Sequence, residues 1–472
     1  MKHLETDVAI IGAGTAGMSA YRAVRQAGLR CLIIEGGPYG TTCARVGCMP
    51  SKLLIAASEA AHDASHAAEF GVHIQGRLQI NGREVMDRVR RERDRFVGFV
   101  VEAVQGFDPA DRLQGYARFL SDTELQIDNH TRVTASRTIV ATGSSPVIPP
   151  MYEGLGDRLV VNDDVFNWEN LPESVLVVGP GVIGMELGQA LARLGVRVQL
   201  LGRSPSVGGI ADPVVLEAAL SAFQQELSLA PCAEVHSVKR LAQGVHVCFT
   251  PKGGARREET YEYVLMAVGR RPNLDKLDFE KTSAHFDSRG NPVFDADTLQ
   301  VNNTPVFLAG DVNARMPLLH EAADDGRFAA LNAVDYPQVK PFERRSPISV
   351  VFTDPQLMWV GQRFNQLDAA QTVVGEVGFH NQGRARVILK NKGVLRVYAD
   401  RCSGQFLGAE MAGPAAEHLA HLLAWSHQQK LTIRQMLAMP FYHPVIEEGL
   451  RTALRDADGQ VCCDAADPSV GG

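Results

Sequence analysis

Two stretches of the chain share one pattern: a short apolar run, a glycine-rich turn and a helical run. In the first, residues 4–11 predict a buried strand, residues 15–28 a helix, and residues 31–34 a second strand. In the second, residues 175–178 predict a strand, and an apolar helix leads to a further strand at residues 197–201. Strand, helix and strand in this order predict an α/β fold.

The first glycine-rich turn has the spacing of a nucleotide-binding loop. Gly12, Gly14 and Gly17 would allow a tight turn, close approach of a pyrophosphate, and contact between helix and strand. The N-terminus of the following helix offers free N–H groups to a phosphate. Glu35 follows Gly12 by 23 residues, where a carboxylate can accept hydrogen bonds from a ribose. Dinucleotide binding is the prediction, and a purely structural turn is the alternative.

The second turn repeats the first with one change. Gly179, Gly181 and Gly184 take the places of the first three glycines, but the counterpart of Glu35 is Gly202, followed by Arg203. Two such turns in one chain predict two dinucleotides, most simply a flavin and a nicotinamide.

Further strand ends support this organisation. Thr142 and Gly143 follow a short predicted strand that ends at residue 141, and Gly269 follows the second unit in a similar sequence. Residues 306–309 predict a buried strand that leads to Asp311, which could return the chain to the first nucleotide site.

Length and composition limit the function classes. A chain of 472 residues exceeds one compact domain, and from about residue 345 no phosphate loop occurs, which predicts a separate third domain. The net charge of -7 argues against nucleic-acid binding. No apolar stretch is long enough to span a membrane and no secretion signal is evident, so we expect a cytoplasmic protein. The arginines between residues 88 and 95 alternate with acids, which favours a solvated helix face.

Cys43 and Cys48 are the first candidates for chemistry, because a close cysteine pair in a cytoplasmic protein is more often catalytic or metal-binding than structural. In a regular helix this spacing leaves the two thiols on different faces, too far apart for a relaxed disulfide. Gly47 and Pro50 make a distorted turn credible. No second ligand pair follows nearby, so we predict a redox disulfide rather than a metal pair or inert core thiols, and no metal site.

The run from Cys43 to Lys52 closely resembles the redox-active motif of the flavoprotein disulfide reductases, most of all the dihydrolipoyl dehydrogenases. The resemblance extends over nearly the whole chain. It implies two Rossmann-like domains, for FAD and NAD(P), and a C-terminal α+β dimerisation domain. The implied boundaries are 1–149 for the first part of the FAD domain, 150–274 for the NAD(P) domain, 275–344 for the second part of the FAD domain, and 345–472 for the interface domain.

The resemblance also implies residue roles. Glu35 is expected to hold the adenosine ribose of FAD, Asp311 the ribityl chain, and the backbone at Ala117 the adenine region. Lys52 is expected beside the flavin, paired with Glu186, where a cation would stabilise negative charge on the reduced ring. The other expected cofactor-binding residues are Gly12, Gly14, Gly17, Thr42, Thr142, Gly143, Gly179, Gly181, Gly184, Arg203 and Gly269.

His443 lies in a run that resembles the family's His-Pro-Thr-x-x-Glu signature, with Val445 in place of threonine. An imidazole can take a proton from a thiol near neutral pH, and Glu448 is the expected orienting acid. A purely structural histidine is the alternative. In the family this histidine serves the partner subunit, so the resemblance implies a homodimer.

The implied activity is dihydrolipoyl oxidation, with small-molecule dithiols or lipoyl domains as substrates. A substrate thiol deprotonated by His443 would attack Cys43, the accessible thiol, and Cys48 would face the flavin, which passes electrons to NAD(P)+. Alternatives are an NADPH-dependent reductase of another disulfide, a mercuric or other metal-ion reductase using the tail pair Cys462 and Cys463, and a non-catalytic flavin-bound docking subunit.

Two departures from the family pattern bear on specificity. Arg45 and Thr41 replace the usual asparagine and glycine near the thiols, and a positive charge there favours a thiolate. Gly202 and Arg203 lack the acid that favours NAD and could accommodate a 2′-phosphate, so NAD and NADP both stay open.

Overall fold

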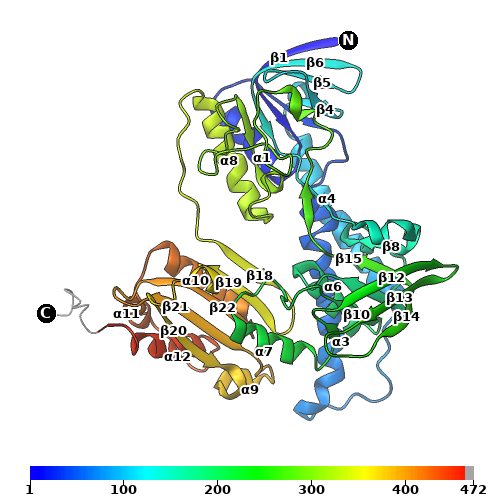
Figure 1. Cartoon of the computed structure of the whole chain (residues 1–472), viewed down its shortest axis with the longest axis vertical. Coiled ribbons are helices and arrows are strands. Elements are labelled where there is room, and N and C mark those ends of the chain that lie inside the picture. Colours follow the sequence, from blue (N-terminus) through cyan, green and yellow to red (C-terminus); the bar gives the residue numbers. More distant parts are fainter. Residues whose placement is uncertain (463–472) are drawn as a thin grey trace.

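The computed structural model of the chain describes residues 1–462. Its first domain, at the top of Figure 1, is built on a sheet of order β3-β2-β1-β6-β5-β4, with β17 beside β6. The strands are β1 (Lys2–Ile11), β2 (Cys31–Glu35), β3 (Arg112–Gln114), β4 (Ala117–Phe119), β5 (Glu124–Ile127), β6 (Thr131–Val140) and β17 (Val306–Leu308). The helices are α1 (Thr15–Gln26), α2 (Thr42–Val46), α3 (Cys48–His66), α4 (Gly82–Gln105) and α8 (Leu319–Asp335).

The second domain contains a parallel sheet of order β11-β10-β9-β15-β8. Its strands are β8 (Leu159–Val161), β9 (Ser174–Val178), β10 (Arg197–Leu201), β11 (Ser228–Ala230) and β15 (Tyr263–Met266), and its helices α5 (Asn162–Val165), α6 (Val182–Arg193) and α7 (Pro213–Phe223). A separate antiparallel sheet, which the sequence pattern did not reveal, contains β12 (Glu234–Leu241), β13 (Gly244–Thr250) and β14 (Arg257–Tyr261).

The third domain, at the lower left of Figure 1, is an antiparallel sheet of order β18-β19-β22-β21-β20 with helices packed on it. The strands are β18 (Ile348–Val351), β19 (Gln356–Gly361), β20 (Thr372–Gly378), β21 (Val394–Asp400) and β22 (Phe406–Gly413). The helices are α9 (Gly383–Val387), α10 (Ala416–Gln428), α11 (Ile433–Leu437) and α12 (Glu447–Asp458). Leu395, Met411, Leu419 and Leu450 belong to its buried core.

This architecture confirms the predicted α/β fold class and both strand–helix–strand units. The strand expected to be short before Thr142 is the end of β6, which begins at Thr131. It is longer because residues 131–134 pair with both β1 and β5.

The prediction of a purely solvated arginine face on α4 is wrong for two of its residues. Arg93 is only 14% exposed, and its Nη1 donates to the Phe166 carbonyl at 3.0 Å. Arg90 donates to the Trp168 carbonyl. Helix α4 extends from the first domain to the second (Figure 1), so its arginines meet the backbone that follows α5.

A buried carboxylate joins the second and third domains. Asp212 caps the start of α7 through two backbone N–H groups and also accepts from Arg396 at 2.9 Å and the Tyr398 hydroxyl at 2.8 Å. Its side chain is fully buried. Glu410, also fully buried, accepts from the N–H groups of Ala211 and Asp212. The two domains therefore exchange buried hydrogen bonds in both directions.

We expect Asp212→Ala to destabilise the protein by about 3 kcal/mol, because it removes the fully buried carboxylate that caps α7 and leaves the half-buried Arg396 with only the more exposed Glu376 as its acidic partner. Tyr398→Phe removes one hydrogen bond only and should cost about 1 kcal/mol. Thermal unfolding of both variants and of the parent checks whether Asp212→Ala lowers the melting temperature more than Tyr398→Phe does. Equal melting temperatures for Asp212→Ala and the parent would contradict the prediction.

Candidate active site

The first glycine turn brings two backbone segments into direct contact. A Cβ at Gly12 would lie 2.4 Å from the Ala141 carbonyl oxygen, and one at Gly17 would lie 1.8 Å from the Gly12 oxygen. Only glycine fits at both positions. Within residues 1–462 no atom other than those of Gly14, its chain neighbours and its own helix backbone lies within 4 Å of the corresponding point at Gly14, so this side of the turn is open to a phosphate.

The second turn repeats this geometry. A Cβ at Gly179 would lie 2.5 Å from the Ala267 oxygen, and one at Gly184 would lie 1.9 Å from the Gly179 oxygen. A Cβ at Gly181 would lie 3.9 Å from the Ala267 oxygen, which is the one contact within 4 Å that the described part of the chain makes there beyond its immediate neighbours. The second turn can therefore receive a pyrophosphate in the same way.

The residues expected around FAD converge on the end of the first sheet. Glu35 ends β2, and its backbone oxygen accepts from Gly115 at 2.9 Å, two residues before Ala117 begins β4. Asp311 follows β17, and its Oδ2 accepts from the Ser144 hydroxyl at 2.9 Å. These positions fit a dinucleotide that extends from the glycine turn towards Asp311.

The segments that leave the two nucleotide-binding units pair with each other. Strand β7 (Ser144–Pro146), after Gly143, pairs with β16 (Arg270–Pro272), after Gly269. The Thr142 hydroxyl donates to the Asn273 oxygen at 2.8 Å. This two-stranded ribbon fixes the junction of the first two domains.

A chain of hydrogen bonds leads from Asp311 to the thiol helices. Ser144 accepts from Arg270 Nε at 2.9 Å, and Arg270 Nη1 donates to Asn162 Oδ1 at 3.4 Å. Asn162 Nδ2 then donates to the carbonyl of Val46, at the end of α2, at 2.8 Å. Sequence reasoning missed Arg270 and Asn162. The proximity of Arg270 to Gly269 was the only available signal.

The two thiols meet where the helix is interrupted. Helix α2 ends at Val46, Gly47 has φ -126° and ψ -116°, and α3 begins at Cys48. A Cβ at Gly47 would lie 3.2 Å from Cys43 Cα, so glycine permits the close approach. Cys43 and Cys48 are free thiols joined by a hydrogen bond. The predicted distortion at Gly47 is confirmed.

The environment separates the acidities of the two thiols. The hydrogen bond from Cys43 and the charge of Lys52 lower the pKa of Cys48 to about 7. The same hydrogen bond and burial raise the pKa of Cys43. In the single chain Cys48 is exposed and Cys43 half-buried, so exposure alone does not identify the thiol that meets the substrate. Thr42 is exposed at the start of α2.

Lys52 and Glu186 form the expected ion pair. Lys52 Nζ lies 2.8 and 3.0 Å from the two carboxylate oxygens of Glu186, which is 4% exposed on α6. The backbone N–H of Phe352 donates to Glu186 Oε1 at 3.0 Å, and Lys52 Nζ lies 4.5 Å from the centre of the Phe352 ring. All three domains thus contribute to the position of this lysine.

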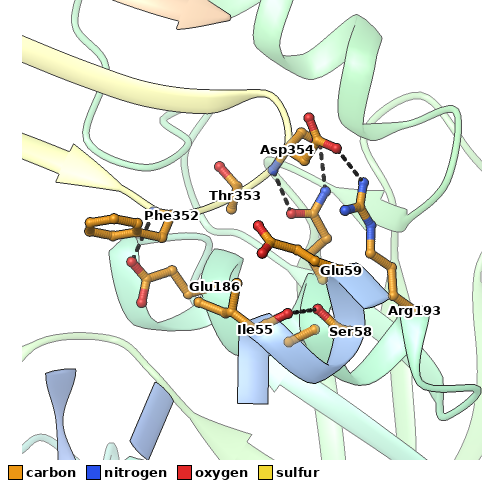
Figure 2. A pocket seen from close by; sticks show the side chains of 10 residues that line it. Ile55, Ser58, Glu59, Glu186, Arg193, Phe352, Thr353 and Asp354 are labelled. Atoms are coloured by element: carbon orange, nitrogen blue, oxygen red, sulfur yellow. Dashed lines mark hydrogen bonds and ion pairs between the residues drawn. The ribbon is translucent and has the colours of Figure 1, made fainter. Parts of the chain in front are cut away.

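The same face of α6 holds the loop that contains Phe352 (Figure 2). Gln189 exchanges two hydrogen bonds with the Asp354 backbone, at 2.7 and 2.8 Å. Arg193 donates to Asp354 Oδ2 at 3.2 Å. This loop was not recognised from the sequence as part of the site.

The side chain of Arg45 is directed away from the position that its closeness to Cys43 in the sequence suggests. Its side chain lies beside Gly40, and its charge, with that of Arg270, opposes the rise that burial causes in the pKa of Asp163. The cation that acts on Cys48 is Lys52.

His443 and Glu448 form a second expected pair. His443 Nδ1 lies 3.0 Å from Glu448 Oε2, while Arg451 donates to Glu448 Oε1 at 3.1 Å. The hydrogen bond from His443 and the N–H of Val445 lower the pKa of Glu448. His443 is 81% exposed, and within residues 1–462 it makes no hydrogen bond to either thiol. Its Nε2 therefore faces outwards from the chain that carries it.

The tail pair is only partly described. Cys462 is exposed, and its N–H donates to the Arg401 carbonyl at 2.9 Å, while Cys463 lies outside the described residues. Residues 1–462 contain no group of three metal-ligating side chains. None of the helices in that part of the chain is long and apolar enough to cross a bilayer.

Known proteins are similar to this chain in sequence and fold. Residues 6–326 match the family model for pyridine nucleotide-disulphide oxidoreductases, and residues 348–454 match that family's dimerisation domain. The dihydrolipoyl dehydrogenase of Halobacterium salinarum is 31% identical over 470 residues, 96% of each chain. LpdA from Mycobacterium tuberculosis superposes with a TM-score of 0.81 at 24% identity, covering 95% of this chain and 99% of the other. The Cu(II) complex of RclA, an HOCl-induced flavoprotein disulfide reductase from Escherichia coli, also gives 0.81, at 21% identity and 96% and 99% coverage.

Two nucleotide-binding units and a thiol pair beside a buried ion pair define an oxidoreductase that acts on sulfur groups. The chain belongs to the pyridine nucleotide-disulphide oxidoreductase family, whose members use FAD and NAD(P). The match to this family's dimerisation domain supports a homodimer.

Because the pKa of Cys48 is lowered, its alkylation by iodoacetamide should accelerate as the pH rises through about 7 rather than near 9.0. Lys52→Met combined with Glu186→Gln should move this midpoint upwards, because the stabilising cation is removed without leaving a buried charge. Mass spectrometry resolves alkylation at each cysteine, and the exposed Cys402 serves as the reference in the same sample. An unchanged midpoint would show that Lys52 does not act on Cys48.

Proposed function

We propose that the protein oxidises dihydrolipoyl groups and passes their electrons through Cys43, Cys48 and FAD to a nicotinamide nucleotide. The observation that carries this proposal is the His443–Glu448 pair, because an imidazole held by a carboxylate at Nδ1 presents Nε2 as a base for a substrate thiol. The similarity to dihydrolipoyl dehydrogenases over nearly the whole chain supports it.

The thiol chemistry balances as two exchanges. A substrate thiolate attacks Cys43 of the Cys43–Cys48 disulfide, and Cys48 leaves as a thiolate beside Lys52. The second substrate thiol attacks the mixed disulfide and releases Cys43, so two electrons reach the protein and the lipoyl disulfide leaves. His443 takes the proton of the attacking thiol, and Cys43 is reprotonated.

These two exchanges leave Cys43 and Cys48 as a reduced dithiol. FAD, when bound, supplies the two-electron link from this dithiol to the nicotinamide. Lys52 is positioned by Glu186 and Phe352 to hold positive charge where electron density increases during transfer. The role of Lys52 is therefore electrostatic, and no proton transfer is assigned to it.

We assign His443 to the thiol pair of the partner subunit. The exposure of its imidazole and the absence of a bond to either thiol within residues 1–462 support an action across the dimer interface. Each of the two sites of the homodimer would then combine thiols from one subunit with a base from the other.

Steady-state turnover tests the substrate assignment. We expect NAD(P)+ reduction with dihydrolipoamide and much slower reduction of glutathione disulfide by NAD(P)H. Both reactions are measured on the FAD-loaded dimer with each nicotinamide. Efficient reduction of glutathione disulfide without dihydrolipoamide oxidation would assign the protein to a different disulfide.

His443→Gln should lower turnover roughly 100- to 10,000-fold, because the thiol loses its base. Glu448→Gln should have a smaller effect, since the imidazole stays in place but loses its charged partner. The alkylation of Cys48 serves as the control and should keep its pH midpoint in both variants. Turnover of His443→Gln that matches the parent would exclude the histidine from catalysis.

Metal-ion reduction is a second candidate, favoured by the exposed Cys462 and by a structural relative solved as a Cu(II) complex. Under the dihydrolipoyl proposal, the double variant Cys462→Ala and Cys463→Ala keeps full turnover with dihydrolipoamide. A metal-reducing activity in the parent that this variant loses, with no dihydrolipoamide turnover in either protein, would support metal reduction instead.

A further inference from the structure

We propose that the second nucleotide site selects a nicotinamide nucleotide whose adenosine ribose carries a 2′-phosphate. The inference rests on the proposed function only for the use of a nicotinamide nucleotide, and it names which one. It is argued from the repeat of the two glycine turns within this chain.

The two turns make equivalent backbone hydrogen bonds. The Gly12 N–H donates to the Ile34 oxygen at 2.7 Å, and the Gly179 N–H donates to the Leu201 oxygen at 2.8 Å. The residues that follow these acceptors, Glu35 and Gly202, are therefore structural equivalents.

In the first site the acid is held by the turn itself. Glu35 Oε2 accepts from the Ala13 N–H at 2.8 Å, and Oε1 accepts from the Gly37 N–H at 2.8 Å. The turn thus provides both the space for this carboxylate and a donor that fixes it. A carboxylate so placed can accept from ribose hydroxyls.

In the second site Pro180 replaces Ala13 and excludes an acid for two reasons. Proline has no N–H to donate to a carboxylate. A Cβ at Gly202 would also lie 2.7 Å from Pro180 Cγ and 3.0 Å from its Cδ. Pro180 is buried, and its carbonyl accepts from Gly208 at 2.8 Å, so the ring cannot easily move away. This site cannot hold the carboxylate that would favour an unmodified ribose.

Arg203 offers the opposite charge at the same edge of the sheet. It is exposed, and across residues 1–462 it has no hydrogen bond, ion pair or ring contact. A guanidinium can bind a phosphate through two parallel hydrogen bonds. The missing acid and the adjacent cation together favour a 2′-phosphate over a 2′-hydroxyl.

Two probes that differ only in the 2′-phosphate test this inference. Adenosine 2′,5′-bisphosphate and adenosine 5′-monophosphate are titrated calorimetrically into the FAD-loaded dimer. We expect the bisphosphate to bind at least about tenfold more tightly than the monophosphate. This margin, the ratio of the two dissociation constants, should shrink with added salt. Arg203→Ala should remove most of this margin and Arg203→Lys should keep part of it.

Arg256→Ala is the matched control, because Arg256 is another exposed arginine of the same domain, paired with Glu258 at 3.5 Å. It should leave the margin unchanged. Equal binding of the two probes to the parent, or a margin that survives Arg203→Ala, would overturn the inference. The titration involves no dithiol, so failure of the dihydrolipoyl assignment leaves its result unaffected.

A second pair of variants tests the role of Pro180. Pro180→Ala with Gly202→Glu should restore the geometry of the first site and favour the monophosphate over the bisphosphate. Gly202→Glu alone should not, because the proline ring still occupies the space. Equal preference for the monophosphate in both variants would show that Pro180 does not exclude the acid.

Discussion

The ion pair between Lys52 and Glu186 is the contact on which the geometry of the thiol site depends. Lys52 lies one turn after Cys48 on α3, Glu186 is buried on α6 of the second domain, and Phe352 of the third domain donates to the same carboxylate. A buried carboxylate needs a partner for each oxygen, and here each partner comes from a different domain. The pKa of Cys48 is lowered by Cys43 and Lys52 of its own motif, and the other two domains contribute by fixing the position of Lys52.

Helix α6 extends this dependence beyond the ion pair. Glu186, Gln189 and Arg193 share one face because they are three and four residues apart, and all three bind the loop from Phe352 to Asp354. The hydrogen bonds from Arg396 and Tyr398 to Asp212 hold the same two domains together at a second point. The third domain thus supports the thiol site of its own subunit, while its His443 is assigned to the thiol site of the partner subunit.

Features confined to a short window could be predicted from the sequence. The glycine turns, the break at Gly47 and the His443–Glu448 pair each follow from local backbone or spacing requirements. The bonds of Arg90, Arg93 and Asp212 could not be predicted, because they depend on which domains face each other. The direction of Arg45 could not be predicted from its closeness to Cys43, because two residues along a helix place side chains on nearly opposite faces, and Arg45 lies beside Gly40.

The contact between Pro180 and Gly202 also constrains how this family member can change over generations. An acid at residue 202 is harmful while the proline is present, whereas loss of the proline is tolerable on its own, since the equivalent Ala13 supports the same turn. A chain that gained an acid at residue 202 would therefore first have to lose Pro180. A single substitution at residue 202 cannot give the second turn the carboxylate that Glu35 gives the first.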